Sequence, residues 1–264
     1  IGEDRFASVS TSLRIWNTKE DRPVMKLSPR TSGVPLTSFD RSLSNKIATC
    51  STDTTIAVWD LERGKMETRM IAHDKAVFDV AFSPSKEFLF ASVSDDGSMR
   101  LFDTRDLNHS TIVFEGSNPL LRLAWNEDNT IAAIAAEMEE VLFFDMRKVS
   151  TTHRTFPLGA CPNAIAWDRN RCLAALSNGT VVNAETNQVT HTGSGGALNI
   201  SCSNGKAAVV IDPKTVTLIN LVYFHLVLPL YNKIEYYKSH KRRKSGFRYS
   251  FQRQCMWQAM ASSG

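Results

Sequence analysis

Three residues in one stretch of this chain have the types of a nucleophilic triad. His73, Ser92 and Asp96 could act as base, nucleophile and orienting acid, the arrangement that hydrolases use to activate a serine hydroxyl. That chemistry requires the serine and the histidine to face an open, oriented site. Whether they do depends on the structural elements that carry them.

The sequence gives less support to a metal-binding or phosphate-binding site than to a triad. The six histidines are scattered, and none pairs with a cysteine or carboxylate at metal-ligand spacing. The glycine-rich run GSGG (193–196) is too short for a phosphate loop and precedes strand-like residues rather than a helix. We therefore expect no metal ion, no other cofactor and no small-molecule substrate.

A third group of candidate residues is an Asp-x-Arg sequence that occurs twice. LFDTR (101–105) and FFDMR (143–147) both end in Asp-x-Arg, which places Asp103 with Arg105 and Asp145 with Arg147. An arginine held at the rim of a rigid element can make bidentate contacts with a carboxylate or a carbonyl. The alternative is an exposed loop arginine, paired in the first case with Asp106.

The elements that position these residues repeat along the chain. Two independent columns of aromatic residues recur at steps of 43, 43 and 42. In the first column each aromatic residue is followed by Asn or Asp; its members are Trp16, Trp59, Phe102 and Phe144. In the second column each aromatic residue ends an apolar segment; its members are Phe39, Phe82, Trp125 and Trp167.

Both columns alternate apolar residues with polar or small ones, as strands do, and turn signals such as SDDGS (94–98) lie between them. A repeat of about 40–45 residues with four short strands is typical of a propeller blade. Two later units are weaker: Ala184-Glu185 stand where an aromatic-Asp pair would fall, and VTLIN (216–220) ends in Ile219-Asn220.

These strings resemble the WD-repeat family, and more specifically its Transparent Testa Glabra/anthocyanin-regulator group, with its DCAF-type animal members. The resemblance rests on PLTSFD (35–40), IAHDKAVFDVAF (71–82) and FASVSDDGSMRLFD (90–103), and it covers roughly residues 6–220. It implies an all-β propeller from a seven-bladed parent, with about five blades plus partial strands in residues 1–221. We expect an N-terminal truncation of one or two blades and an atypical tail at 222–264.

The resemblance also assigns roles to the candidate residues. It implies a hydrogen-bonded structural clamp of a histidine, a strand serine or threonine, a turn aspartate and a tryptophan. His73, Ser92 and Asp96 match it in one unit, with Phe102 in place of the tryptophan, and Asp53 and Trp59 match it in the preceding unit, which has no matching histidine. Residues packed in this way would not form a nucleophilic site, so we predict no catalytic residue and no enzyme.

For Asp103, Arg105, Asp145 and Arg147 the resemblance implies contact with the damaged-DNA-binding adaptor of cullin–RING ubiquitin ligases. The function expected is a non-enzymatic scaffold bridging proteins, with DYRK-type kinases or MYB and basic helix–loop–helix (bHLH) transcription factors as implied partners. One alternative is a substrate receptor of a cullin–RING E3 ligase, and another is a truncated, non-functional gene product.

Composition bounds the remaining possibilities. The chain has 264 residues and a formal net charge of +4, but residues 222–264 hold eight Lys/Arg and one Glu, which leaves the body slightly acidic. We therefore expect no direct nucleic-acid binding by the body. The apolar run at 216–231 is short and contains Pro229, so we expect no membrane span. Five cysteines without a CxxC pair indicate reduced thiols and a cytoplasmic and nuclear location.

Overall fold

The computed structural model describes residues 5–29, 33–148, 153–193, 195–203, 205–212 and 215–221. The secondary structure in these ranges consists of 22 β-strands. The tail predicted at 222–264 lies outside the described residues. A membrane-crossing helix, which would have to be long and apolar, is not found in the described part of the chain.

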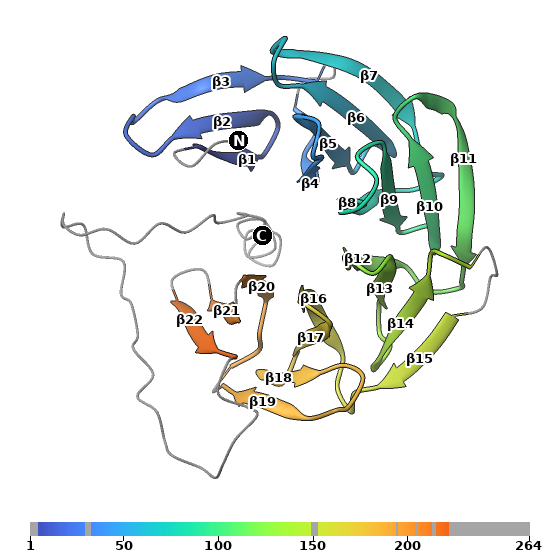
Figure 1. Cartoon of the computed structure of the whole chain (residues 1–264), viewed down its shortest axis with the longest axis vertical. Coiled ribbons are helices and arrows are strands. Elements are labelled where there is room, and N and C mark those ends of the chain that lie inside the picture. Colours follow the sequence, from blue (N-terminus) through green and yellow to red (C-terminus); the bar gives the residue numbers. More distant parts are fainter. Residues whose placement is uncertain are drawn as a thin grey trace.

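The strands form six antiparallel sheets, here called blades 1 to 6, arranged around a common axis (Figure 1). Blade 1 contains β1 (Arg5–Val9), β2 (Leu13–Asn17) and β3 (Pro23–Leu27). Blade 2 contains β4 (Leu36–Arg41), β5 (Lys46–Ser51), β6 (Thr55–Asp60) and β7 (Lys65–Ile71). Blade 3 contains β8 (Val77–Phe82), β9 (Leu89–Ser94), β10 (Ser98–Asp103) and β11 (Asp106–Glu115).

The second half of the chain repeats this arrangement. Blade 4 contains β12 (Leu120–Trp125), β13 (Thr130–Ala135), β14 (Glu140–Asp145) and β15 (His153–Pro157). Blade 5 contains β16 (Pro162–Asp168), β17 (Arg171–Leu176), β18 (Thr180–Asn183) and β19 (Val189–Thr192). Blade 6 contains β20 (Asn199–Ser203), β21 (Lys206–Asp212) and β22 (Thr215–Asn220).

The count of about five blades plus partial strands is wrong, because the described residues form six sheets. The strands before residue 28 pair with one another as blade 1 instead of remaining isolated remnants. Blades 5 and 6 form although they lack the aromatic-Asp pair, because their strands pair through the backbone.

Both aromatic columns lie on strands at fixed places in the blades. In blades 2 to 5 the innermost strand ends with or near a residue of the second column, such as Phe82 in β8 and Trp125 in β12. The first column lies two strands farther from the axis, with Trp59 in β6 and Phe102 in β10. One repeat of about 43 residues therefore corresponds to one blade.

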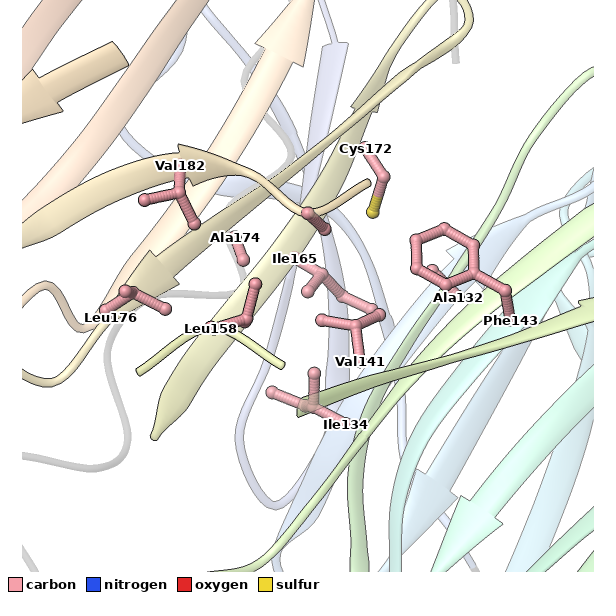
Figure 2. Packing of buried hydrophobic residues seen from close by; sticks show 11 residues of the cluster. Ala132, Ile134, Val141, Phe143, Leu158, Ile165, Cys172, Ala174, Leu176 and Val182 are labelled. Carbon is pink, nitrogen blue, oxygen red and sulfur yellow. The ribbon is translucent and has the colours of Figure 1, made fainter. Parts of the chain in front are cut away.

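Apolar side chains between neighbouring blades hold the propeller together. Figure 2 shows the cluster between blades 4 and 5, where Ile134 and Val141 of blade 4 pack with Ile165 and Leu176 of blade 5. Similar clusters join each of the other neighbouring pairs, which gives five clusters for six blades. Within the described residues no such cluster joins blade 6 to blade 1, and the two end blades are separated in Figure 1.

Candidate functional site

The propeller has two faces, which carry different candidate residues. In blade 3, Val77 at the start of β8 pairs with Ser94, next to the turn that holds Asp96. At the other end, Phe82 pairs with Phe90, and the neighbouring Leu89 pairs with Asp103. We call the end of the blades with Asp96 the clamp face, and the end with Asp103 and Arg105 the fork face.

On the clamp face the structure brings His73, Ser92 and Asp96 together. Nε2 of His73 lies 2.7 Å from Oγ of Ser92, and Nδ1 lies 3.0 Å from Oδ2 of Asp96. Asp96 also accepts hydrogen bonds from the backbone N–H of Ser98 and of Asp74, over 2.9 and 3.0 Å. The turn, the strand and the preceding loop are thus joined through one carboxylate.

Burial determines what this cluster can do. Ser92 is 0% exposed and His73 is 1% exposed, so a substrate cannot reach the serine oxygen. Burial lowers the pKa of His73, although the Asp96 carboxylate opposes that effect. Burial would raise the pKa of Asp96, but the hydrogen bonds from Ser98 outweigh it and hold that pKa well below its usual range. His73 and Ser92 are therefore closed to solvent, and the Asp96 carboxylate beside them is held in its ionised form.

Blade 2 contains a different version of the clamp. Nε1 of Trp59 donates to Oγ1 of Thr49 over 2.8 Å. Nη2 of Arg69 donates to Oδ2 of Asp53 over 2.7 Å, and Nε of Arg69 donates to Oγ1 of Thr55 over 3.2 Å. Arg69, on the outer strand β7, thus contacts Asp53, the turn aspartate of blade 2. The equivalent turn aspartate of blade 3, Asp96, contacts His73. Arg69 was not among the residues predicted from the sequence.

Two aspartates on the inner strands were also missed. Asp40 of blade 2 accepts a hydrogen bond from the N–H of Phe82 in blade 3 over 2.7 Å. Asp168 of blade 5 accepts one from the N–H of Gly205 in blade 6 over 3.1 Å. Since each pair joins two blades, these aspartates link neighbouring sheets in addition to the apolar clusters. Both aspartates lie near the end of a strand, where the sequence pattern predicts a turn residue and not a contact between blades.

On the fork face the two Asp-x-Arg sequences adopt the same geometry. Nε of Arg105 donates to Oδ1 of Asp103 over 2.9 Å, and its Nη2 donates to Oδ2 over 2.6 Å. In blade 4, Nε of Arg147 donates to Oδ1 of Asp145 over 2.8 Å, and its Nη2 donates to Oδ2 over 2.9 Å. We call these two bidentate pairs the forks. Asp106, the alternative partner considered for Arg105, contacts His109, whose Nδ1 lies 2.9 Å from its Oδ2.

Both forks are exposed, yet their arginines are held in place. The side chains of Arg105 and Arg147 are 66% and 61% exposed. The guanidinium carbon of Arg105 also lies 3.6 Å from the ring centre of Phe88, a cation–π contact. The hydrogen bonds of Arg147 lower the pKa of Asp145 to about 2, and those of Arg105 lower the pKa of Asp103. Each fork therefore stays charged and presents a fixed guanidinium edge that can meet an acceptor on another molecule.

The described residues include no cluster of metal-binding side chains. Within those ranges no three His, Cys, Asp or Glu side chains gather in a way that could hold a metal ion.

Comparison with known proteins gives the family context. Residues 64–103 match the WD40 family, described as WD domain, G-beta repeat. The chain is 39% identical over 178 residues to a DDB1- and CUL4-associated factor 7 homolog of Dictyostelium discoideum, an alignment that covers 62% of this chain and 54% of that protein. It is 36% identical over 170 residues to a WD repeat-containing protein of Saccharomyces cerevisiae, covering 55% of this chain and 32% of that protein.

The chain thus spans about half the length, or less, of these curated relatives. Among solved structures, the computationally designed Ika8 protein aligns with a TM-score of 0.65 and 15% identity, over 84% of this chain and 70% of that one. This likeness concerns the fold alone. The six sheets around one axis make this chain an all-β propeller, and the matched repeat and the relatives show that its sequence is similar to WD-repeat proteins.

Proposed function

We propose that this chain is a non-enzymatic scaffold that brings proteins together, and that its fork face is a docking surface. The observation that carries the proposal is the pair of forks, which repeat one geometry on adjacent blades. Two guanidinium groups held on rigid turns lose little conformational freedom on binding, which favours protein recognition. His73 and Ser92 are closed to solvent, which argues against the hydrolase alternative.

A more specific second candidate is a substrate receptor of a cullin–RING E3 ligase. It is favoured by the printed name of the Dictyostelium relative, a DDB1- and CUL4-associated factor, together with the forks. In this proposal Arg105 and Arg147 contact the damaged-DNA-binding adaptor. The scaffold and the receptor are both binding modules, and the receptor adds one defined partner.

The proposal also covers the family group, the parent protein and the location of the chain. We propose that the chain belongs to the Transparent Testa Glabra/anthocyanin-regulator group, derives from a seven-bladed parent and is cytoplasmic and nuclear. DYRK-type kinases and MYB or bHLH transcription factors stay predicted partners.

The receptor proposal is tested with the double variant Arg105→Gln, Arg147→Gln in an adaptor pull-down. Glutamine keeps hydrogen-bonding capacity but removes the charge and the fork geometry. Arg63→Gln is the matched control, because Arg63 is an exposed arginine in the corresponding turn of blade 2 and lacks the Asp-x-Arg spacing. Loss of capture by the double variant alone supports the receptor proposal. Absence of capture by the unchanged chain, or equal capture by all three proteins, overturns it.

The scaffold proposal has its own test. Tagged chain is purified from cells, the proteins that co-elute are identified, and a second purification through one of them asks whether another is retained. Retention of two different proteins in one complex supports a scaffold. Recovery of the chain always alone, or with one protein at a time, contradicts it.

A further inference from the structure

The turn between β17 and β18 of blade 5 places an asparagine directly before a glycine. These two residues are Asn178, which is exposed, and Gly179. An asparagine side chain can cyclise onto the backbone nitrogen of the next residue, and a glycine there hinders this least because it has no side chain beside that nitrogen. Within the described ranges Asn178 is the one asparagine that precedes a glycine. The sequence has a second such pair at 204–205, of which Asn204 lies outside the described residues.

The fold itself requires the glycine of this pair. Gly179 has φ of +85°, and a Cβ added to it would collide with the carbonyl oxygen of Gly195. A larger residue, which would slow the cyclisation, therefore cannot stand here without disturbing the turn. The blade thus keeps a chemically reactive pair at an exposed position.

Two donors of Thr180 hold the side-chain oxygen of Asn178. Oδ1 of Asn178 accepts hydrogen bonds from the backbone N–H of Thr180 over 3.0 Å and from Oγ1 of Thr180 over 2.5 Å. The ring closed by the first of these bonds contains the nitrogen of Gly179, so the side chain is folded back over the peptide unit that would attack it. When that nitrogen attacks Cγ, negative charge develops on Oδ1, and two donors are already in place to stabilise it.

One backbone hydrogen bond opposes the attack. The N–H of Gly179 donates to the carbonyl oxygen of Leu176 over 3.0 Å, and this bond must break before the nitrogen can react. The bond closes the turn and is not part of the pairing between β17 and β18. Opening an exposed turn takes far less free energy than unfolding the blade, so the reaction can proceed from the folded chain.

Blade 3 offers an internal comparison, because Asp96 precedes Gly97 in the equivalent turn. Oδ1 of Asp96 accepts hydrogen bonds from the N–H and from Oγ of Ser98, over 2.9 and 2.7 Å. The pKa of Asp96, which burial would raise and the hydrogen bonds from Ser98 lower, lies well below its usual range. An ionised carboxylate resists attack by a nitrogen, whereas the neutral amide of Asn178 does not. The same turn should therefore be inert in blade 3 and reactive in blade 5.

We propose that Asn178 is a site of intramolecular deamidation. The nitrogen of Gly179 loses its proton to hydroxide and forms a bond to Cγ of Asn178, and Nδ2 leaves as ammonia, which gives a five-membered succinimide. Water then opens this ring. Attack at Cγ leaves an aspartate at position 178, and attack at the other carbonyl carbon leaves an isoaspartate. Water is the only co-reactant, and nothing is oxidised or reduced.

The two products affect the blade differently. An aspartate at position 178 would keep both hydrogen bonds from Thr180, as Asp53 of blade 2 keeps those from Thr55. It would add one negative charge to the clamp face. An isoaspartate would lengthen the backbone of the turn by one methylene group and disturb the pairing of β17 with β18. Neither effect depends on the proposed scaffold or receptor function.

The first test follows the unchanged full chain by peptide mass spectrometry during incubation at pH 7.0 and pH 8.0, with aspartate and isoaspartate products separated by chromatography. We expect Asn178 to convert at least about tenfold faster than any other described asparagine. Conversion should be faster at pH 8.0, because the attacking nitrogen must lose a proton. Conversion of Asn178 no faster than that of the other asparagines would overturn the proposal, as would isoaspartate forming equally fast at Asp96.

Variants of Thr180 separate the effect of the turn from that of the dipeptide. Thr180→Val keeps the branched shape but removes the hydroxyl donor, and it should slow the conversion of the folded chain about tenfold. Thr180→Ser is the matched control, because Ser98 makes the same contact in blade 3, and its rate should stay within about twofold of the unchanged chain.

A parallel incubation in urea, which unfolds the chain, should give all three proteins the same rate, because the donors are then no longer held beside Oδ1. Circular dichroism checks that each variant is folded without urea. A folded Thr180→Val protein that converts as fast as the unchanged chain would overturn the role of the turn. If Thr180→Val does not fold, the comparison among the asparagines of the unchanged chain decides.

Discussion

The carboxylate of Asp79 in blade 3 accepts a hydrogen bond from the backbone N–H of Leu123 in blade 4 over 3.1 Å. The same carboxylate accepts one from Oγ of Ser38 in blade 2 over 2.6 Å. One buried side chain thereby joins three consecutive blades. Its burial raises its pKa, while the nearby Arg122 and the hydrogen-bond donors oppose that effect. Asp79 therefore has a large part in holding the blades in register around the common axis.

Replacement of Asp79 by asparagine should destabilise the propeller by about 3 kcal/mol, because an amide N–H₂ would then face a buried donor. The free energy of unfolding in urea measures this. Asp95→Asn is the control in the same blade, since Asp95 is 39% exposed and lies 4.0 Å from Lys75. Its effect should stay within about 0.5 kcal/mol. Equal effects of the two substitutions would contradict a joining role for Asp79.

Acid should destabilise the fold through His73. Because burial lowers its pKa below the ordinary 6.5, the unfolded chain takes up a proton more readily than the folded one. The stabilising contribution is complete above pH 6.5 and is lost as the pH falls below that value, at up to about 1.4 kcal/mol per pH unit.

Urea unfolding of the unchanged chain and of His73→Gln at pH 7.5 and pH 5.5 measures this loss. The variant should be less stable at pH 7.5 but should show a smaller drop in stability at pH 5.5. His191, whose pKa is also lowered by burial, contributes with the same sign, so His191→Gln serves as the comparison. Asp96 does not contribute in this range, since its pKa is lowered from 3.8. An unchanged pH dependence in His73→Gln would be evidence against the prediction.

The turn glycine of blade 3 should tolerate no side chain. Gly97 has φ of +80°, and a Cβ added to it would collide with the carbonyl oxygen of Gly116. Gly159 has a similar φ of +74° but nothing within 4 Å of such an atom. Gly159→Ala should lower the free energy of unfolding by about 1 kcal/mol, because alanine disfavours the left-handed backbone conformation. Gly97→Ala should lower it by at least about 3 kcal/mol. Thermal unfolding of the two variants measures the difference, and similar melting temperatures would rule out the collision.

The forks should persist in acid. NMR titration of side-chain carboxyl carbons should give Asp145 a pKa of about 2, because Arg147 donates two hydrogen bonds to its ionised form. Arg147→Gln should return that pKa toward 3.8, whereas Arg105→Gln, in the neighbouring blade, should leave it unchanged. A normal Asp145 pKa in the unchanged chain would mean that the fork is not formed in solution.

Much of the architecture was visible as periodicity. The 43-residue step placed Trp59 and Phe102 on equivalent strands, and Phe82 and Trp125 on the innermost ones, because each blade repeats one pattern of buried positions. The number of blades was underestimated because the strands before residue 28, expected as partial strands, pair with one another as a sheet. In blade 5, Ala184 and Glu185 follow β18, yet the sheet forms from backbone pairing.

For the candidate site, the sequence showed the types of the residues but few of their contacts. Asp-x-Arg spacing is local, so the contact of Arg147 with Asp145 follows from two residues of separation. The contact of Arg69 with Asp53 spans two strands, and Arg105 over Phe88 depends on how a loop folds back beside the turn. No spacing rule indicates these partners.

The sequence by itself determined the repeat, the strand character and the short-range pairs, since hydrophobic alternation and neighbouring side chains act within one blade. The tertiary structure alone decided which residues from different blades meet. Asp79 finds Leu123, 44 positions away, and five inner strands line one pocket at the centre of the propeller, only because the sheets pack radially. That packing is set by the summed burial of apolar side chains between blades, which is a property of the whole assembly and not of any single repeat.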